Sequence, residues 1–402
     1  MFNKVLILSA SAGAGHMRAA EALEKAFVEQ GAAREVRHVD TLQYTTAMFR
    51  KVYADAYIKL VNGFPTILGW LYDRLDDPED DRRLSQILNK LNAVRFTRML
   101  LEFQPDIAVC THFLPSELVA RQKRKGHLNC PLATVVTDMD VHAYWLCPGC
   151  EHYFVAIDET AVHLREMGVP EGDLTVSGIP IDPVFAQPKS KADMRRHYGL
   201  EPETTTILVA TGGFGVGPID HLIQSLLKIR HRVQLVVICG RNEELKIKLD
   251  DMAASLAGQR PEMPRMHIVG FTREMDQYMA ASDILVGKPG GLTTSEALAK
   301  GLVMCIVNPI PGQEERNSDH LLEEGAAIRC NNLPTLAWKI DQLLDDPARL
   351  AAIHANVARL GHADAAHRIV KRLLTLETRT IGKPTPRQRL AGRQDSVAGR
   401  LL

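Results

Sequence analysis

The chain has 402 residues, of which 46% are hydrophobic and 24% charged, a composition typical of soluble proteins with two ordinary domains. Lysine plus arginine equals aspartate plus glutamate at 48 each, so the net charge gives no reason to expect a nucleic-acid partner. We expect neither a signal peptide nor a membrane-spanning helix. The seven cysteines are expected to be reduced thiols in the cytosol. Cys147 and Cys150 have zinc or redox spacing, but no second pair follows, so we interpret them as a structural or accidental pair.

The N-terminal segment predicts a strand, a glycine loop and a helix in succession. Residues 4–8 form a strand that is apolar after Lys4, residues 9–15 are only Ser, Ala and Gly, and His16 opens the helix. A neutral imidazole at this place could accept a proton, although a surface histidine at a helix start is the alternative. The glycines suggest a dinucleotide fingerprint for an oxidoreductase, with Asp40 on the ribose, but Arg18 stands where the third glycine should be.

Residues 41–104 are rich in aromatic and apolar side chains, with basic side chains between them. An amphipathic helical stretch of this composition is typical of proteins that enter the headgroup layer of a membrane. Helices that pack on the N-terminal core would show the same pattern, so both interpretations stay open at this point.

Polar residues follow each of two further predicted buried strands, at 107–110 and 133–136. The groups that follow them include His112, Asp138, Asp140 and His142. Because the carboxyl ends of parallel strands meet at one edge of a sheet, these groups should line a crevice there or support His16. Asp138 and Asp140 form a D-x-D pair that could hold a divalent metal, but a phosphate-binding turn lies elsewhere in the chain, so we predict no metal here.

The second half opens, like the first, with a strand, a glycine turn and a helix. Residues 180–188 form a proline-rich linker, residues 206–210 form the strand, and Gly213 lies in the turn. Repetition of the pattern suggests two Rossmann-like halves that face a shared cleft. Phe271, which follows a later strand, could stack on a flat ligand or pack in the core.

The stretch 283–301 predicts an anion site at the start of a helix. A buried strand at 284–286 leads into a glycine turn, and Thr293 is expected to begin the helix. Backbone N–H groups at a helix start and adjacent hydroxyls favour a phosphate. The residues concerned are Gly290, Gly291, Thr293 and Thr294. The alternative is an ordinary turn in which Thr293 caps the helix and Glu296 closes a capping box.

A polar loop follows the next buried strand, at 302–307. It contains Gln313, Glu314 and Asn317, whose amide and carboxylate groups are suited to binding several sugar hydroxyls. A solvated polar loop is the alternative. Together with the glycine turn, this loop would build one crevice at the carboxyl edge of a parallel sheet, where open α/β sheets bind ligands.

In combination, these motifs resemble the monogalactosyldiacylglycerol synthases and processive diacylglycerol glucosyltransferases, a family related to the lipid II synthase. The resemblance is carried by segments 8–16, 137–145, 177–181, 287–301 and 311–317. It implies an α/β fold of the GT-B type, with two Rossmann-like domains facing a central cleft. We predict an acceptor domain, a donor domain, a closing helix and a flexible basic tail at 1–183, 184–350, 351–377 and 378–402.

The resemblance implies transfer of a hexose from UDP-glucose or UDP-galactose to diacylglycerol, with inversion and without a metal or other cofactor. It implies a peripheral protein at the anionic, cytoplasmic face of the cell membrane, contacted through region 41–104, while the basic tail either touches anionic lipid or stays solvated. The alternatives are UDP-N-acetylglucosamine transfer to a polyprenyl-linked cell-wall precursor and a non-catalytic nucleotide-sugar sensor. The identity of the hexose, the number of sugars added and the oligomeric state are left open.

The same resemblance assigns roles to single residues. His16 would be the general base, with Asp138 beside it in the catalytic set. The acceptor side would comprise His112, Asp140, His142 and Trp145. The helix start would hold the pyrophosphate, Glu296 the ribose, and Glu314 and Asn317 the transferred sugar. The full donor-binding set is Gly15, Gly213, Phe271, Gly290, Gly291, Thr293, Thr294, Glu296, Gln313, Glu314 and Asn317.

Overall fold

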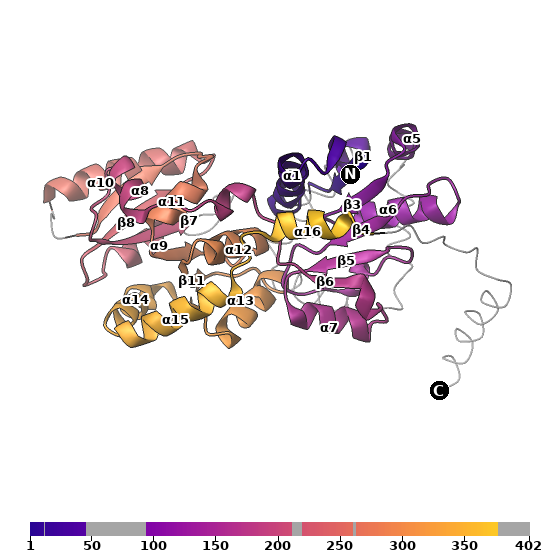
Figure 1. The fold of residues 1–402 in the computed structure, drawn as a ribbon. Coiled ribbons are helices and arrows are strands. Elements are labelled where there is room, and N and C mark those ends of the chain that lie inside the picture. Colours follow the sequence, from indigo (N-terminus) through magenta and orange to yellow (C-terminus); the bar gives the residue numbers. More distant parts are fainter. Residues whose placement is uncertain (12, 46–93, 211–218, 260–262, 377–402) are drawn as a thin grey trace, which may run out of the picture.

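The computed structural model describes residues 1–11, 13–45, 94–210, 219–259 and 263–376. These residues form two six-stranded parallel sheets with helices around them, and the two halves lie next to each other (Figure 1). The expected α/β architecture with two Rossmann-like halves is confirmed. Most of the aromatic region 41–104, Gly213 with its turn and the basic tail lie outside the described residues.

The first sheet has the strand order β2-β1-β3-β4-β5-β6, with every neighbouring pair parallel. Its strands are β1 (Phe2–Ser9), β2 (Ala33–Asp40), β3 (Ile107–Cys110), β4 (Leu132–Val135), β5 (His152–Val155) and β6 (Leu174–Val176). The helices of this half are α1 (Ala14–Glu29), α5 (Val94–Phe103), α6 (Phe113–Arg124) and α7 (Asp158–Glu166).

Helices cover both faces of the first sheet, which explains why β1 is apolar without alternation. Leu6 and Leu8 belong to one core cluster with residues of α5 and α6. Val5 and Ile7 belong to another with residues of α1 and of α16 (Ala365–Leu373). A strand that is buried on both faces needs a continuous run of apolar residues, and β1 was predicted from such a run.

The second sheet has the order β12-β11-β10-β7-β8-β9 and is also parallel throughout. Its strands are β7 (Thr205–Ala210), β8 (Val233–Ile238), β9 (Arg265–Val269), β10 (Ile284–Gly287), β11 (Val303–Val307) and β12 (Ala327–Cys330). The helices of this half are α8 (Lys191–His197), α9 (Ile219–Leu226), α10 (Glu243–Gln259), α11 (Met275–Ala281), α12 (Gly291–Ala299), α13 (Gln313–Glu323), α14 (Leu336–Leu344) and α15 (Pro347–Leu360).

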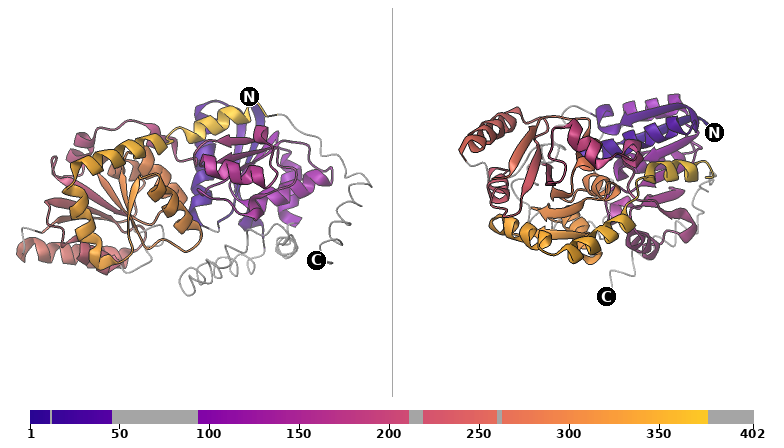
Figure 2. Two further views of the ribbon diagram at one scale, coloured as in Figure 1. Left: turned by 90° about the horizontal axis from the view of Figure 1, so that it is seen from below. Right: turned by 60° about the vertical axis from the view of Figure 1, so that its left-hand side comes forward.

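The chain crosses between the halves twice, and the two crossings lie in contact. The first passes Gly178 and the second passes His362, whose side chain lies directly against Gly178. After the second crossing, α16 packs on α1, and Arg368 donates to the Val176 carbonyl at the end of β6 (2.7 Å). Both views of Figure 2 show α16 against the first half. A closing element therefore follows α15, while the predicted domain boundaries themselves stay a prediction.

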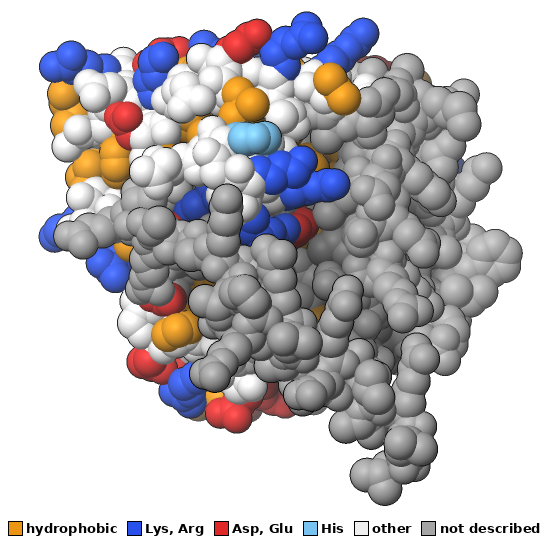
Figure 3. Space-filling model, turned by 90° about the vertical axis from the view of Figure 1, so that its right-hand side faces the viewer, with side chains coloured by type: hydrophobic (Ala, Val, Ile, Leu, Met, Phe, Trp, Pro, Cys, Tyr) orange, Lys and Arg blue, Asp and Glu red, His pale blue; other side chains and the backbone are white. Residues whose placement is uncertain are grey.

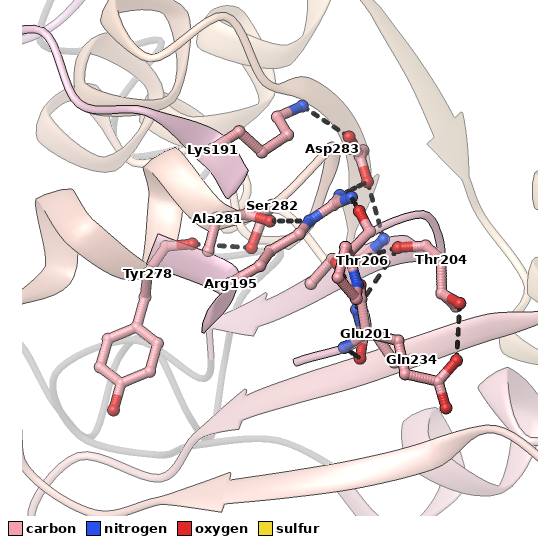
Figure 4. A network of polar contacts seen from close by, with 11 residues as sticks. Lys191, Arg195, Glu201, Thr204, Thr206, Gln234, Tyr278, Ala281, Ser282 and Asp283 are labelled. Carbon is pink, nitrogen blue, oxygen red and sulfur yellow. Dashed lines mark hydrogen bonds and ion pairs between the residues drawn. The ribbon is translucent and has the colours of Figure 1, made fainter. Parts of the chain in front are cut away.

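A polar network anchors the beginning of β10 (Figure 4). Asp283 accepts hydrogen bonds from the buried Arg195 of α8 (2.5 Å) and from the Thr206 backbone in β7 (2.7 Å). Lys191 pairs with the other carboxylate oxygen of Asp283 (2.6 Å). The network fixes where β10 begins, and thereby where the glycine turn at its other end is presented.

The strand orders locate the ligand-binding edge of each sheet. In the first sheet the chain leaves β1 for β2 on one side and later returns to β3 on the other. In the second it leaves β7 for β8 and returns to β10. Ligands of open α/β sheets bind beyond the carboxyl ends of the strands at such switch points. The loop that leads into α1, just before His16, and the turn before α12 lie at these two points.

Candidate active site

His16 lies in the first turn of α1, and its surroundings hold it as a neutral base. Its Nδ1 is 3.0 Å from the Thr111 carbonyl oxygen and 2.8 Å from Thr137 Oγ1. Because a carbonyl oxygen only accepts, Nδ1 carries the proton and Nε2 keeps its lone pair. Burial lowers the pKa of His16 to about 4, against the smaller effect of the Thr111 hydrogen bond. The imidazole is therefore uncharged at neutral pH.

His112 and His142 surround His16 together with aromatic rings. The ring centroids of His16 and His112 are 4.6 Å apart, and Trp145 lies 6.2–6.4 Å from all three histidine rings. His112 Nδ1 accepts the Leu114 N–H and so caps α6, which leaves its proton on Nε2. Burial lowers the pKa of His112 well below its usual value and that of His142 to about 4. The structure thus brings the predicted acceptor-side rings together around the base.

The loop after β4 carries Asp138 and Asp140 in different environments. Burial raises the pKa of Asp138 to about 7, while a hydrogen bond from Gln313 of the other half acts in the opposite direction. Asp140 forms an ion pair with Arg316 of α13 and lies 3.6 Å from His163. Among the described residues, no three histidine, cysteine or acidic side chains are arranged to hold a metal ion. Both aspartates are engaged with the second half.

The helix after the glycine turn begins earlier than the sequence suggested. α12 starts at Gly291, and Gly290, not Thr293, is its N-cap, without a side-chain capping bond. The capping-box alternative is wrong, because the carboxylate of Glu296 is buried and paired with Arg18 of α1. The free N–H groups of the helix start are therefore presented by Gly290 and its successors, with Thr294 fully buried behind them and Thr293 half-buried.

Glu296 and Arg18 form an ion pair across the two halves. Burial raises the pKa of Glu296 to about 7, and Arg18 counteracts that rise. The Arg18 side chain is 42% exposed, whereas that of Glu296 is 2% exposed, so one partner is solvated and the other is not. Gly15, in the first turn of α1, also lies against the second half, at Leu292.

The polar loop and α13 complete the site beside the glycine turn. Gln313 begins α13, and Glu314 accepts the Ile310 N–H through Oε2 (2.7 Å), with its pKa raised by burial. Asn317 is fully buried and bonds backbone groups of both halves, Met139 N–H and the Pro289 carbonyl, each at 3.0 Å.

Phe271 is set apart from the core. The residue is 54% exposed, which excludes the core-packing alternative, and the Arg241 guanidinium lies 5.2 Å from the centroid of its ring. An exposed ring beside a guanidinium is available for stacking on a flat ligand.

Three residues that tie the halves together were assigned no such role from the sequence. Arg18, Met139 and Arg316 bond partners as many as 278 residues away in the chain. Thr137 instead bonds His16 within the first half. The only signal was Arg18, which stood out as the departure from the dinucleotide pattern. The geometry as a whole brings a neutral base and an anion-binding helix start to one place, as a transfer of an activated group to a hydroxyl requires.

Comparison with known proteins identifies the family. Residues 16–181 match the family described as monogalactosyldiacylglycerol synthase, and residues 206–369 match the C-terminal domain of glycosyltransferase family 28. A processive diacylglycerol beta-glucosyltransferase of Staphylococcus epidermidis is 30% identical over 332 residues, which are 80% of each chain. The chain belongs to this family of diacylglycerol glycosyltransferases. The namesake of Staphylococcus carnosus is 29% identical over 93% of each chain.

Solved structures show the fold of this diacylglycerol glycosyltransferase. MurG of Acinetobacter baumannii aligns with a TM-score of 0.62 at 15% identity, covering 93% of this chain and all of that one. Anabaena Alr3699/HepE, solved with UDP-glucose, aligns with a TM-score of 0.51 at 15% identity over 93% of this chain. The GT-B fold is confirmed, and membership of a glycosyltransferase family sets the oxidoreductase alternative aside. Within the described ranges, no helix is long and apolar enough to span a membrane.

Proposed function

We propose that the protein transfers glucose from UDP-glucose to the free hydroxyl of diacylglycerol, with inversion and without a metal. The observation that carries the proposal is the junction of the two switch points, where Thr137 contacts both His16 and the start of α12. Glucose is preferred over galactose because the similar chains are named beta-glucosyltransferases.

The donor would bind on the second half. The N–H groups at the start of α12 and the positive end of its dipole would hold the pyrophosphate and stabilise the charge that develops on the departing UDP. Phe271 would stack on uracil, ionised Glu296 would accept from the ribose, and Glu314 would accept from glucose hydroxyls. The structural neighbour solved with UDP-glucose supports this class of donor.

The acceptor would bind among the rings of the first half. Nε2 of His16 would take the proton of the diacylglycerol hydroxyl as that oxygen attacks the anomeric carbon from the face opposite UDP. General-base catalysis of this kind contributes about 10²–10⁴-fold. The uncharged histidines and Trp145 make surroundings suited to the glycerol and acyl ends of a lipid.

The first half would meet the membrane at its cytoplasmic face. α5 and α6 are neighbours, joined by a bond from Gln122 to Thr97. Arg95, Arg98 and Lys125 are exposed there. Figure 3 shows Lys and Arg side chains on this side of the molecule, with Asp and Glu side chains among them. Basic residues near an anionic surface contribute about 1 kcal/mol each.

The experiment is transfer of label from UDP-hexoses into an organic-soluble product, with diacylglycerol in liposomes that contain anionic lipid. We expect labelled glucosyl product from UDP-glucose and less binding to neutral liposomes. Labelled product from UDP-galactose instead would show that the donor is UDP-galactose. Label only with a polyprenyl-linked acceptor and UDP-N-acetylglucosamine would move the protein to cell-wall synthesis. UDP binding without transfer to either acceptor would make it a nucleotide-sugar sensor.

A further inference from the structure

Asn317 joins two segments that belong to different halves. Its Oδ1 accepts the Met139 N–H of the loop after β4, and its Nδ2 donates to the Pro289 carbonyl of the glycine turn, each at 3.0 Å. Since one partner is a donor and the other an acceptor, the orientation of the amide is fixed. Both the oxygen and the nitrogen of the amide are therefore hydrogen-bonded to backbone groups.

The loop that Asn317 holds is docked on the second half by independent contacts. The Met139 side chain is buried in a core cluster made mostly of residues of the second half, although the strand before its loop, β4, belongs to the first. Asp140 pairs with Arg316, one residue before Asn317. On the other side, Thr160 of α7 donates to the Met139 carbonyl at 2.6 Å. The loop therefore has one position relative to both halves.

The same loop reaches the base. Thr137, two residues before Met139, places its Oγ1 2.8 Å from His16 Nδ1. A continuous path of contacts thus runs from Pro289 in the donor turn through Asn317 and Met139 to Thr137 and His16.

We propose that Asn317 is a positioning residue that fixes the base relative to the donor turn, and not a ligand of the transferred sugar. The inference rests on the proposed function and assigns Asn317 a different task within it. The side chain is fully buried. A sugar hydroxyl could bond the amide only by displacing Met139 N–H or the Pro289 carbonyl, and would leave a buried backbone group unpaired.

A positioning role and a sugar-binding role of Asn317 predict different effects of its removal on substrate binding and on turnover. A positioning residue acts on the distance between His16 and the anomeric carbon, and a misplacement of 1 Å costs roughly 10²-fold in rate. A sugar ligand acts on the affinity for UDP-glucose and leaves the affinity for UDP unchanged.

The test compares the wild type with Asn317→Ala by calorimetric titration of UDP and of UDP-glucose, followed by steady-state transfer. We expect the ratio of the two dissociation constants to stay within about twofold of the wild type, while kcat falls about 10²-fold. Asn331→Ala, an exposed asparagine in the loop after β12, is the matched control and should change neither quantity. A selective loss of UDP-glucose affinity of about tenfold, or an unchanged kcat, would overturn the proposal.

Asn317→Asp keeps the test decisive should the alanine variant fail to fold. Its carboxylate still accepts from Met139 N–H but opposes the Pro289 carbonyl, and protonation of the buried acid restores a donor. We expect kcat relative to the wild type at the same pH to rise as the pH falls from 8 to 5.5, with the ratio of dissociation constants unchanged. A relative kcat that does not depend on pH would contradict the proposal.

These readouts separate the inference from the proposed function. Wild-type transfer to diacylglycerol tests the function. The comparison of the two dissociation constants tests Asn317 whichever lipid proves to be the acceptor.

Discussion

Replacing Gly291 by alanine should force the two halves apart at a point where their backbones lie in close contact. A Cβ built on Gly291 would lie 2.3 Å from the Thr137 carbonyl oxygen and 3.0 Å from Ile179 Cδ1. Carbon and carbonyl oxygen normally approach to about 3.3 Å, so the backbone of Thr137 must retreat by roughly 1 Å. The obstacle is a backbone atom and cannot rotate away.

The magnitude follows from that displacement. Overpacking of this kind costs about 1–3 kcal/mol, reduced by about 0.5–1 kcal/mol because alanine favours a helix more than glycine does. The rate should suffer more than the stability, since a shift of about 1 Å between base and donor costs roughly 10²-fold in kcat. The assay is urea unfolding together with transfer from UDP-glucose to diacylglycerol.

The neighbouring glycine is the matched control. A Cβ on Gly290 would lie 3.6 Å from Glu314 Oε1, an ordinary contact. Gly290→Ala should therefore keep the stability of the wild type within about 0.5 kcal/mol, whatever it does to phosphate binding. Wild-type stability and kcat in Gly291→Ala, or equal destabilisation by both substitutions, would refute the reasoning.

Three further substitutions test the site and its support. Arg18→Met should lower the free energy of unfolding by about 1–2 kcal/mol at pH 8, discounted for the exposure of Arg18, and by less at pH 6. The loss is smaller at pH 6 because the pKa of Glu296 is raised to about 7. Below that pH its buried carboxyl is protonated in the wild type and in the variant, so the ion pair contributes little to the stability of the wild type. Equal losses at both pH values would contradict this. Asp283→Asn should cost about 2–4 kcal/mol in urea unfolding, since it leaves the buried guanidinium of Arg195 without its anion, whereas Asp251→Asn on the exposed part of α10 should be neutral. Phe271→Ala should weaken UDP binding by about 1–3 kcal/mol in calorimetric titration, because a stacking contact with the base is lost, and should change kcat little. Undiminished affinity for UDP would show that Phe271 does not stack on uracil.

Much of the fold was predictable because buried parallel strands leave a plain signal. The apolar run 107–110 coincides with β3, and the runs at 206–210 and 284–286 each lie within one residue of β7 and β10. Neither β6 nor β12 was predicted. β6 has three residues, all of them only partly buried, and β12 has four, one of them an arginine. The start of α12 was placed two residues late, because a threonine resembles an N-cap more than a glycine does.

The site was predictable as a set of motifs but not as a set of contacts. The family resemblance assigned His16 and Glu296 to one site, and the strand-and-turn patterns before them predicted that each would lie at the edge of a sheet. No local pattern could reveal that Glu296 pairs with Arg18 or that Asn317 bonds Met139, since these pairs form only when the halves dock. The pKa of Asp138 near 7 has the same origin, because burial between the halves causes it.

The measurement that tests the account most directly is single-turnover transfer from UDP-glucose to diacylglycerol by the wild type and by His16→Gln. The glutamine keeps a side-chain donor for the Thr111 carbonyl but has no basic nitrogen. We expect the variant to bind UDP as the wild type does and to transfer glucose about 10²–10⁴-fold more slowly. Transfer at the wild-type rate by His16→Gln would contradict the assignment of the base, and with it the account of how the two halves act together.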